Sequence, residues 1–414
     1  MPGQSLIGIA AFIAIAWAIS ENRARVPWRV IAAALVLELL IALALLKVPA
    51  LAAVFLGLNK AVLALQAATK AGTSFVFGYL GGGNLPFAET FPGAAFVLAF
   101  QALPLILVVS ALSALLYHWR VLPAVVRAFA WALQRAFGLG GAAGVGVAAN
   151  VFVGMVEAPL LVRPYVANMS RADLFAVMCA GMATIAGTMM VLYAGFIGQI
   201  VPDALGHILT ASLINAPGAV LMARLMVPPE AAAEAVIQVD LPRTAASAVD
   251  AVTQGTIDGV QLLINVIAML IVMVALVSLI NAGLGLLPDV AGGPLTLQRM
   301  LGWLMAPFAW GIGIPWAEAP AAGGLLGVKV VLNELIAYIG LTQAEAGTFS
   351  AKSKLILAYA FCGFANLASL GIMIGGLGTM APERRAEIAG LGLKSILAGM
   401  LTTLTTAAIV ALVI

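Results

Sequence analysis

The fold is decided by two stretches, AANVFVGMVEAPLLVRP at residues 148–164 and GVKVVLNELIAY at residues 327–338. Each stretch places one acid, Glu157 or Glu334, among mostly apolar residues. A charged side chain at the centre of a membrane-spanning helix costs about 2.5–3.5 kcal/mol on insertion scales, so it usually faces a wet or paired site. Both glutamates are therefore candidates for ligand contacts.

Helix breakers accompany both acids. Gly154 and Pro159 flank the first acid, and Pro315 precedes the second. A hairpin that enters and leaves the membrane on one side exposes backbone at its tip, which is tolerated only where protein or a water-filled cavity surrounds that tip. We therefore expect two re-entrant helical hairpins, at about 140–168 and about 297–340.

The composition of the chain indicates a membrane protein. Of its 414 residues, 63% are apolar and 9% are charged, whereas about a quarter are charged in soluble domains. This composition excludes a soluble enzyme. The net charge of +3 is too small to indicate a nucleic-acid partner. Cys179 and Cys362 both lie in apolar stretches and provide neither a disulfide framework nor a metal cluster, and we expect no organic cofactor.

Several stretches are long enough to cross a bilayer, which needs about 20 apolar residues per helix. We expect an all-α polytopic protein with about eight transmembrane helices. The expected spans are residues 4–20, 29–47, 94–117, 172–199, 206–227, 258–286, 352–379 and 387–413. The first segment has no basic leader and no cleavage site, so it is expected to be retained.

The short loops predict the orientation in the membrane. Arg and Lys residues of short loops stay on the cytoplasmic side, and the alternating loops that carry Arg23, Arg224 and Arg384 agree with one another. Both termini would then be periplasmic, in a cell inner membrane. The helix predicted at 120–137 has basic residues spaced along an apolar face, as in a helix that lies in the membrane interface.

The chain also repeats itself. CAGMATIAGTM at 179–189 follows the first hairpin and CGFANLASLGI at 362–372 follows the second. An offset of 182 places Thr184 opposite Asn366. Since the predicted hairpins open to opposite sides, these segments indicate inverted repeats with discontinuous helices, as in secondary transporters.

This pattern divides the chain into four parts. Residues 1–93 form N-terminal helices and a connecting segment, which act as a scaffold. Residues 94–227 form the first repeat, with the interfacial helix, the first hairpin and an unwound helix. Residues 228–257 are a polar cytoplasmic linker, and residues 258–414 form the second repeat, with the second hairpin and its own unwound helix.

The chain resembles the concentrative nucleoside transporters along nearly its whole length, from SLIGIA to GLKSILAG. The most specific motifs are AANVFVG with EAPLLVRP, LFAVMCAGMATIAG, and CGFANLASLGI with GGLG and APERR. The resemblance implies a sodium-coupled symporter that brings nucleosides into the cytoplasm and is not an enzyme. It also implies a homotrimer surrounded by membrane lipids, in which each subunit has its own pathway.

The family's substrate contacts map onto residues of this chain. By resemblance, Glu157 would bind on the base side, and Phe364 would pack beside the sugar. Glu334, Asn366 and Ser369 would take the ribose hydroxyls. This is reasonable chemistry because a carboxylate offers only acceptors and an amide offers both donors and acceptors.

The resemblance also implies a sodium site. Asn150 and Thr184 would supply side-chain oxygens, while Val153 and Ile185 would supply main-chain carbonyls. Oxygen ligands on unwound backbone suit a small cation that has lost its water.

Two positions depart from the family. Met155 and Val156 stand where well-known members have Gln and Thr just before the tip glutamate. An apolar wall discriminates less than polar groups that pair with the nucleobase edge, and Met189 would add a flexible apolar contact. We expect weakened or altered pyrimidine recognition, with purine or atypical nucleosides as candidate substrates.

Structural roles are the alternative for these polar residues. Glu157 and Glu334 could pair with Arg163 and Lys329 to close the hairpins, and Asn366 with Ser369 could join helices by hydrogen bonds. Two further acids have structural interpretations: Glu318 would serve folding or gating, and Glu38 would make a helix-packing or subunit contact.

Three other functions are compatible with a polytopic membrane protein. A proton-coupled nucleoside symporter would use Glu157 or Glu334 to accept the proton. A membrane-embedded enzyme acting on a lipid-linked nucleotide or sugar lacks support, since the sequence has no catalytic His, no metal-ligand cluster and no large aqueous domain. A passive channel would equilibrate its ligand and would not accumulate it.

Overall fold

The computed structural model describes residues 2–89, 94–155, 157–230, 245–290 and 292–414. Within these ranges every regular element is a helix, as expected for the all-α class. The helices in chain order are α1 (Pro2–Ala18), η1 (Arg23–Arg25), α2 (Trp28–Lys47), α3 (Pro49–Phe77), η2 (Gly78–Gly81), α4 (Leu98–Gln101), α5 (Leu105–His118), α6 (Val121–Phe137), α7 (Gly141–Asn150), α8 (Glu157–Leu160), α9 (Arg163–Val166), α10 (Arg171–Ala183), α11 (Gly187–Ile197), α12 (Ala204–Met226), α13 (Ala248–Leu284), α14 (Leu297–Gly311), α15 (Ala319–Val331), α16 (Glu334–Thr342), α17 (Ala351–Phe361), α18 (Leu367–Met380), η3 (Pro382–Arg384) and α19 (Arg385–Val413).

The described residues include six helical segments that are long and apolar enough to cross a membrane. They are Trp28–Lys47, Leu98–His118, Arg171–Ile197, Ala204–Met226, Ala248–Leu284 and Pro382–Val413. Three of them, α2, α12 and α19, begin and end close to predicted spans. Helix α1 is shorter than a span. These segments fit a multi-pass membrane protein.

Two of the predicted spans are each divided into two helices in the structure. The span expected at 172–199 is divided by Thr184–Ala186, between α10 and α11. The span expected at 352–379 is divided by Cys362–Asn366, between α17 and α18. Each interruption leaves helix-terminal carbonyl and amide groups without partners in their own helix, and these groups must be satisfied by other elements.

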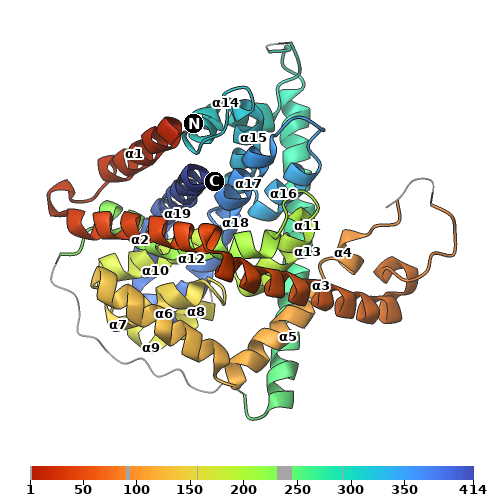
Figure 1. Cartoon of the computed structure of the whole chain (residues 1–414), viewed down its shortest axis with the longest axis horizontal. Coiled ribbons are helices and arrows are strands. Elements are labelled where there is room, and N and C mark those ends of the chain that lie inside the picture. Colours follow the sequence, from red (N-terminus) through yellow and green to blue (C-terminus); the bar gives the residue numbers. More distant parts are fainter. Residues whose placement is uncertain (1, 90–93, 156, 231–244, 291) are drawn as a thin grey trace.

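Helices α3 and α13 differ from the sequence-based expectation. No span was expected between residues 48 and 93, yet α3 extends from Pro49 to Phe77 and carries the chain away from the main body (Figure 1). Helix α13 begins at Ala248, inside the predicted polar linker, because Ser247 accepts a hydrogen bond from the Asp250 amide and caps the helix.

Both predicted hairpin regions contain helices that fold back on each other. Near the first acid, a Cβ added at Gly146 of α7 would lie 3.5 Å from Val162, just beyond α8. Near the second acid, a Cβ at Gly340 of α16 would lie 2.8 Å from Leu325 of α15. The expected segment 297–340 contains three helices, since a further break at Leu332 and Asn333 separates α15 from α16.

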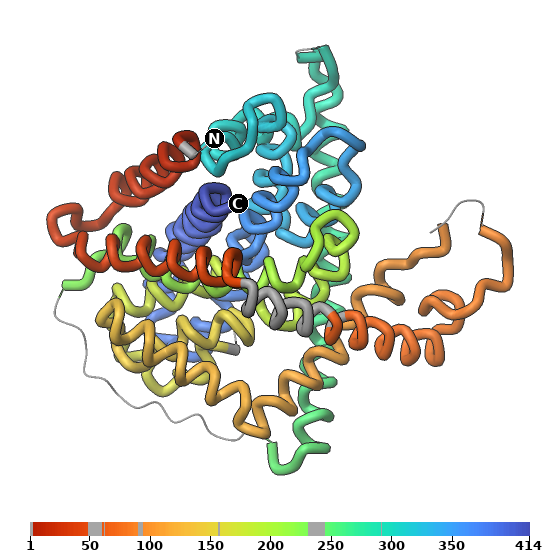
Figure 2. Tube along the Cα trace, viewed as in Figure 1, coloured from red at the N-terminus to blue at the C-terminus, as the bar shows by residue number. Residues whose placement is uncertain are grey.

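The first and last helices meet at the end of α14. Gly313 has φ +104°, and a Cβ there would lie 2.8 Å from Ser5 Oγ of α1 and 2.8 Å from the Cβ of Ala411 of α19. Both the left-handed conformation and the close approach require glycine. The two chain ends therefore lie on the same side of the molecule, as Figure 2 shows.

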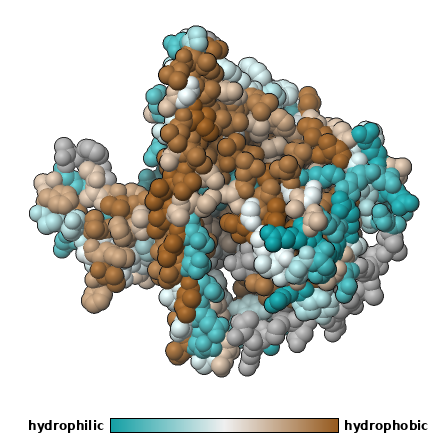
Figure 3. Space-filling view, turned by 180° about the vertical axis from the view of Figure 1, so that it is seen from behind, coloured by the Kyte–Doolittle hydropathy of each residue, from teal (hydrophilic) through white to brown (hydrophobic). Residues whose placement is uncertain are grey.

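The core and the outer surface are built from different helices. Helices α10, α12 and α19 are mostly buried and pack against one another. Helix α13 is largely exposed and apolar, and forms the long brown ridge in Figure 3. It packs on α5 through small residues, since a Cβ added at Gly255 would lie 2.7 Å from the Ser110 carbonyl oxygen.

Candidate substrate and ion site

Glu334 is buried where the second broken helix and α11 meet. It is the first residue of α16, and Asn333 caps that helix by accepting a hydrogen bond from the Ile336 amide at 2.9 Å. The Tyr193 hydroxyl donates to Glu334 Oε1 at 2.5 Å, and Asn366 Nδ2 donates to Oε2 at 2.9 Å. The carboxyl group is therefore held by two neutral donors.

Asn366 uses both ends of its amide. Its Nδ2 donates to Glu334, and its Oδ1 accepts a hydrogen bond from the Ser369 amide at 2.8 Å, which caps α18. This orients the amide and brings Glu334, Asn366 and Ser369 together. Phe364 is also buried and lies in the same helix break.

Lys329 is occupied by other groups. Its Nζ donates to the Ala360 carbonyl at 2.7 Å and to Thr403 Oγ1 at 2.8 Å. Among the described side chains, Lys329 forms no ion pair with Glu334. Lys329 thus provides a hydrogen-bond donor for a carbonyl at the end of α17. The alternative role, in which Lys329 pairs with Glu334 to close the hairpin, is not supported by an ion pair between the described side chains.

Several oxygen atoms lie close to Asn150, the last residue of α7, beside the break between α10 and α11. Asn150 Nδ2 donates to the Gly146 carbonyl at 2.9 Å. Its Oδ1 is buried and accepts no hydrogen bond from the described residues. Thr184 Oγ1 lies 2.9 Å from the Asn150 carbonyl and 2.8 Å from the Ala180 carbonyl. An orphaned amide oxygen among carbonyl and hydroxyl oxygens fits a hard cation such as sodium.

The other two residues expected at the ion site lie beside this cluster. Val153 is in the turn that follows α7, and its amide donates to the Ala149 carbonyl at 2.9 Å. Ile185 is fully buried in the break after α10, and its amide donates to Ser212 Oγ at 3.4 Å. The cluster therefore contains residues from the end of α7 and the turn after it, and from the break between α10 and α11.

Helix α11 connects the two regions. The Gly187 amide, at its start, donates to the Phe152 carbonyl in the turn after α7 at 3.0 Å. Tyr193, farther along, donates to Glu334. Six residues of α-helix span about 9 Å, so the oxygen cluster and the Glu334 cluster lie at opposite ends of a short, rigid segment.

The expected base side of the site is described only in part. Met155 and Met189 are buried, and a Cβ added at Gly181 would lie 3.0 Å from the Met155 Cβ. Val156 and the side chain of Glu157 lie outside the described residues, although the Glu157 backbone begins α8. Their predicted roles remain predictions.

The two acids with predicted structural roles, Glu38 and Glu318, contact other parts of the fold. Glu38 of α2 is fully buried against α12, where a Cβ added at Gly218 would lie 3.0 Å from Glu38 Oε1. Glu318 precedes α15, and its Oε2 accepts a hydrogen bond from the Ser350 amide at 3.3 Å. Neither acid has a contact with the Glu334 cluster among the interactions of the described side chains.

Sequence reasoning missed Tyr193, which donates to Glu334, and Asn215 of α12, whose Nδ2 donates to the carbonyls of Ala183 and Cys362 beside the two helix breaks. Both are polar side chains in otherwise apolar helices, and a buried tyrosine hydroxyl or amide usually has a partner. That rule could have identified them as members of the site, but it could not have named the groups that they contact.

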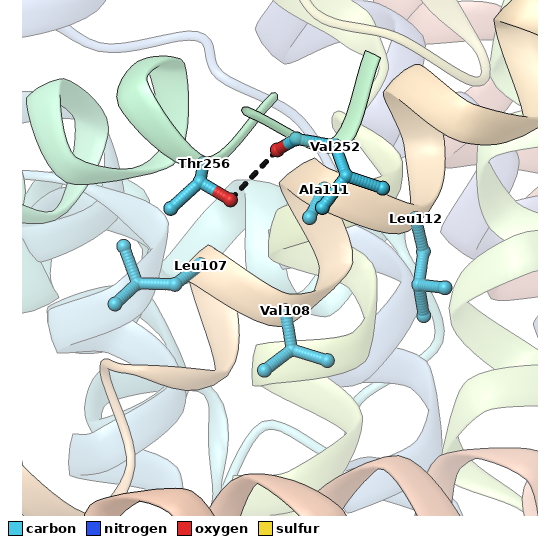
Figure 4. Close-up of a pocket in the computed structure, with 6 residues that line it drawn as sticks. All are labelled: Leu107, Val108, Ala111, Leu112, Val252 and Thr256. Carbon is cyan, nitrogen blue, oxygen red and sulfur yellow. Dashed lines mark hydrogen bonds between the residues drawn. The ribbon is translucent and has the colours of Figure 1, made fainter. Parts of the chain in front are cut away.

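A groove lies away from these clusters, between α5 and α13. Its volume is about 340 Å³, and its lining residues, shown in Figure 4, are Leu107, Val108, Ala111, Leu112, Val252 and Thr256. The Thr256 hydroxyl donates to the Val252 carbonyl at 2.7 Å. The groove therefore offers apolar walls and does not suit a polar ligand. No group of three or more potential metal-ligating His, Cys, Asp or Glu residues occurs in the described part of the chain.

Comparison with known proteins covers nearly the entire chain. Residues 7–80 and 207–411 match the N-terminal and C-terminal regions of the Na+ dependent nucleoside transporters, and residues 99–200 match a nucleoside recognition (Gate) family. The nucleoside permease NupC of Helicobacter pylori is 34% identical, across 99% of this chain and 97% of the permease. Sodium/nucleoside cotransporter 2 of Rattus norvegicus is 33% identical, across 95% of this chain and 60% of the cotransporter.

A solved structure has the same fold. The structure of CNTnw in an inward-facing substrate-bound state superimposes with a TM-score of 0.90 at 38% sequence identity, and covers 99% of this chain and 97% of CNTnw. The relatives are transporters and permeases, which confirms that the chain is not an enzyme. The chain belongs to the concentrative nucleoside transporter family and is a nucleoside transporter of the membrane.

Proposed function

We propose that the protein is a sodium-coupled symporter that carries nucleosides into the cytoplasm. The observation that carries this proposal is the pair of buried clusters joined by α11. One cluster has a carboxyl group that accepts hydrogen bonds from two neutral donors, Tyr193 and Asn366. The other has a buried amide oxygen, on Asn150, without a donor among the described residues.

The first cluster would bind the sugar. Glu334 accepts hydrogen bonds from the ribose hydroxyls, while Asn366 can both donate and accept. Hydrogen bonds to an ionised carboxylate are about twice as strong as neutral ones. Ser369 adds a third polar group, and Phe364 packs beside the sugar ring.

The second cluster would bind the coupling ion. Asn150 Oδ1, Thr184 Oγ1 and the carbonyls of Val153 and Ile185 form a set of neutral oxygen ligands, which sodium prefers. Ion binding orders the backbone from Asn150 to Val153, and that backbone leads directly into the residues of the base side.

The base side would accept purine or atypical nucleosides. Glu157 binds the base, while Met155, Val156 and Met189 provide an apolar wall. Such a wall discriminates weakly between bases, and two polar readers of the pyrimidine edge are replaced.

The ion supplies the driving force. One charge that moves through a potential of 100 mV releases about 2.3 kcal/mol, which sustains a gradient of about 50-fold. The hairpins and the broken helices carry the ligand while the outer helices stay in place. The protein works as a homotrimer in the inner membrane with both termini in the periplasm.

The binding step tests this proposal directly. Purified protein is heated with adenosine or uridine, in sodium and in choline buffer, because a ligand that binds the native state raises the melting temperature. We expect stabilisation by adenosine that requires sodium. Equal stabilisation in both buffers would favour a proton-coupled symporter, and no stabilisation by any nucleoside would contradict the substrate class.

A further inference from the structure

One side chain contacts both helix breaks. Asn215 lies within α12 and is fully buried. Its Nδ2 donates to the Ala183 carbonyl at 2.7 Å and to the Cys362 carbonyl at 2.7 Å. Ala183 is the last residue of α10, and Cys362 directly follows α17. A single amide nitrogen therefore joins the ends of the two broken helices.

Chemistry fixes the orientation of this amide. The last carbonyls of a helix have no partner within the helix, and an amide nitrogen has two hydrogens to donate. The reverse orientation would place Asn215 Oδ1 against two carbonyl oxygens, which repel it. In the observed orientation Oδ1 is buried and accepts no hydrogen bond from the described residues.

An unsatisfied buried oxygen costs stability, about 1–3 kcal/mol in general. The Asn215 amide is therefore not explained by packing alone, since an apolar side chain would avoid that cost. Its distinctive property is the pair of donors on one nitrogen.

Neighbouring contacts place α12 against both breaks. Ser212 Oγ accepts a hydrogen bond from the Ile185 amide at 3.4 Å, and the Cys362 thiol donates to the Ile208 carbonyl at 3.4 Å. Residues 208, 212 and 215 follow i, i+4 and i+7 spacing and lie on one face of the helix. One face of α12 thus contacts both interruptions.

The two breaks also touch each other. A Cβ added at Gly363 would lie 2.7 Å from the Ala183 carbonyl oxygen. No side chain fits between them. If one break shifts, the other must therefore move with it, or the contact between the two breaks is lost. Interiors packed in this way transmit displacement.

We infer that Asn215 is a positioning residue that couples the ion cluster to the nucleoside cluster, an inference that rests on the proposed function. Ala183 directly precedes Thr184, and Cys362 leads through the break to Asn366. When an ion draws in Thr184 and Ile185, the Ala183 carbonyl moves with them. The shared nitrogen then changes the position of the Cys362 carbonyl and hence that of the ribose-binding amide.

The first test compares binding with and without sodium. Adenosine dissociation constants are measured for wild type and Asn215→Leu, in sodium and in choline. The constant in choline divided by the constant in sodium reports the coupling between ion and nucleoside. We expect the substitution to reduce this ratio about tenfold, as for the loss of one or two net hydrogen bonds. An unchanged ratio in a folded variant would overturn the inference.

The matched control removes a different buried polar group. Thr406 of α19 is fully buried, and its hydroxyl has no partner among the described residues. Thr406→Val should leave the ratio at the wild-type value. If it lowers the ratio as much as Asn215→Leu does, general loosening of the core explains the result and Asn215 has no special role.

A second readout keeps the inference testable whichever ion is coupled. Amide hydrogen exchange is followed in peptides that cover residues 183–187 and 362–366. Asn215→Leu should speed exchange in both peptides, whereas Ser212→Ala should speed it only in the first. Acceleration confined to one peptide by Asn215→Leu would overturn the inference. Equal wild-type binding in sodium and choline would instead sink the proposed ion coupling, and the exchange result would still decide the role of Asn215.

Discussion

Asn366 Nδ2 lies 2.9 Å from Glu334 Oε2, and this hydrogen bond joins the N-termini of two helices. Glu334 is the first residue of α16, and Asn366 is the cap of α18. The pair can therefore offer a carboxyl group and an amide to the same ligand.

Glu334→Gln should weaken nucleoside binding by at least tenfold. The substitution removes the charge that strengthens the hydrogen bonds, and such bonds contribute about 1.5–3 kcal/mol each. Uptake of labelled adenosine should be lost while the protein elutes at its native size. The exposed Glu345 provides a matched control, since Glu345→Gln should transport normally. Wild-type uptake by Glu334→Gln would remove this residue from the site.

Asn150→Ala should raise the sodium concentration needed for half-maximal adenosine binding by about tenfold. The variant loses the buried oxygen that has no donor among the described residues. Adenosine affinity at saturating sodium should change much less. Sodium titrations measure both quantities, and the exposed Asn168 serves as a control through Asn168→Ala. A sodium dependence like that of wild type would exclude Asn150 as an ion ligand.

The double variant Met155→Gln with Val156→Thr should shift selectivity toward pyrimidines. It supplies polar groups where this chain has an apolar wall, and such groups change discrimination by about tenfold or more. Competition between uridine and labelled adenosine measures the shift. If uridine already displaces adenosine from wild type at equal concentration, the predicted purine preference is wrong.

Glu21, which lies outside the membrane-spanning segments, should make the stability of the protein depend on pH. The Arg171 guanidinium at 2.9 Å, followed by the Lys394 ammonium at 2.7 Å, lowers the pKa of Glu21 from 4.5 to about 2. A carboxyl group whose pKa is lower in the folded state stabilises the fold above pH 4.5, and this contribution is lost as the pH falls toward 2.

Glu21→Gln should therefore cost about 1 kcal/mol at pH 7, because these groups are partly exposed and screened. The melting temperatures of variant and wild type, measured in detergent, should converge as the pH falls from 5 toward 2. A difference that stays constant over this pH interval would show that the carboxylate charge does not contribute.

Two residues that the sequence indicated, Glu334 and Asn366, lie 2.9 Å apart, whereas several predicted helix boundaries were wrong. Glu334 and Asn366 were identified because a carboxylate or an amide in an apolar stretch is costly unless it has a function or a partner. Helix α3 was missed although residues 51–68 are mostly apolar and contain one charged side chain, Lys60. The interruption at Leu332 and Asn333 was missed because asparagine caps a helix without a glycine or proline to mark the site.

The contacts between distant segments could not be predicted from the chain alone. Tyr193 donates to Glu334 because α11 packs against α16, and Asn215 donates to two carbonyls because α12 packs against α10 and α17. A hydropathy pattern specifies which helix faces are buried, but it does not specify their neighbours. Such partners follow from tertiary packing.

The central claim is tested most directly by accumulation of adenosine in proteoliposomes. Labelled adenosine is supplied outside, with either an inward sodium gradient at equal pH or an inward proton gradient in choline. We expect the internal concentration to exceed the external one with the sodium gradient and only to reach it with the proton gradient. Accumulation driven by protons in sodium-free buffer, or simple equilibration under both gradients, would contradict sodium-coupled symport.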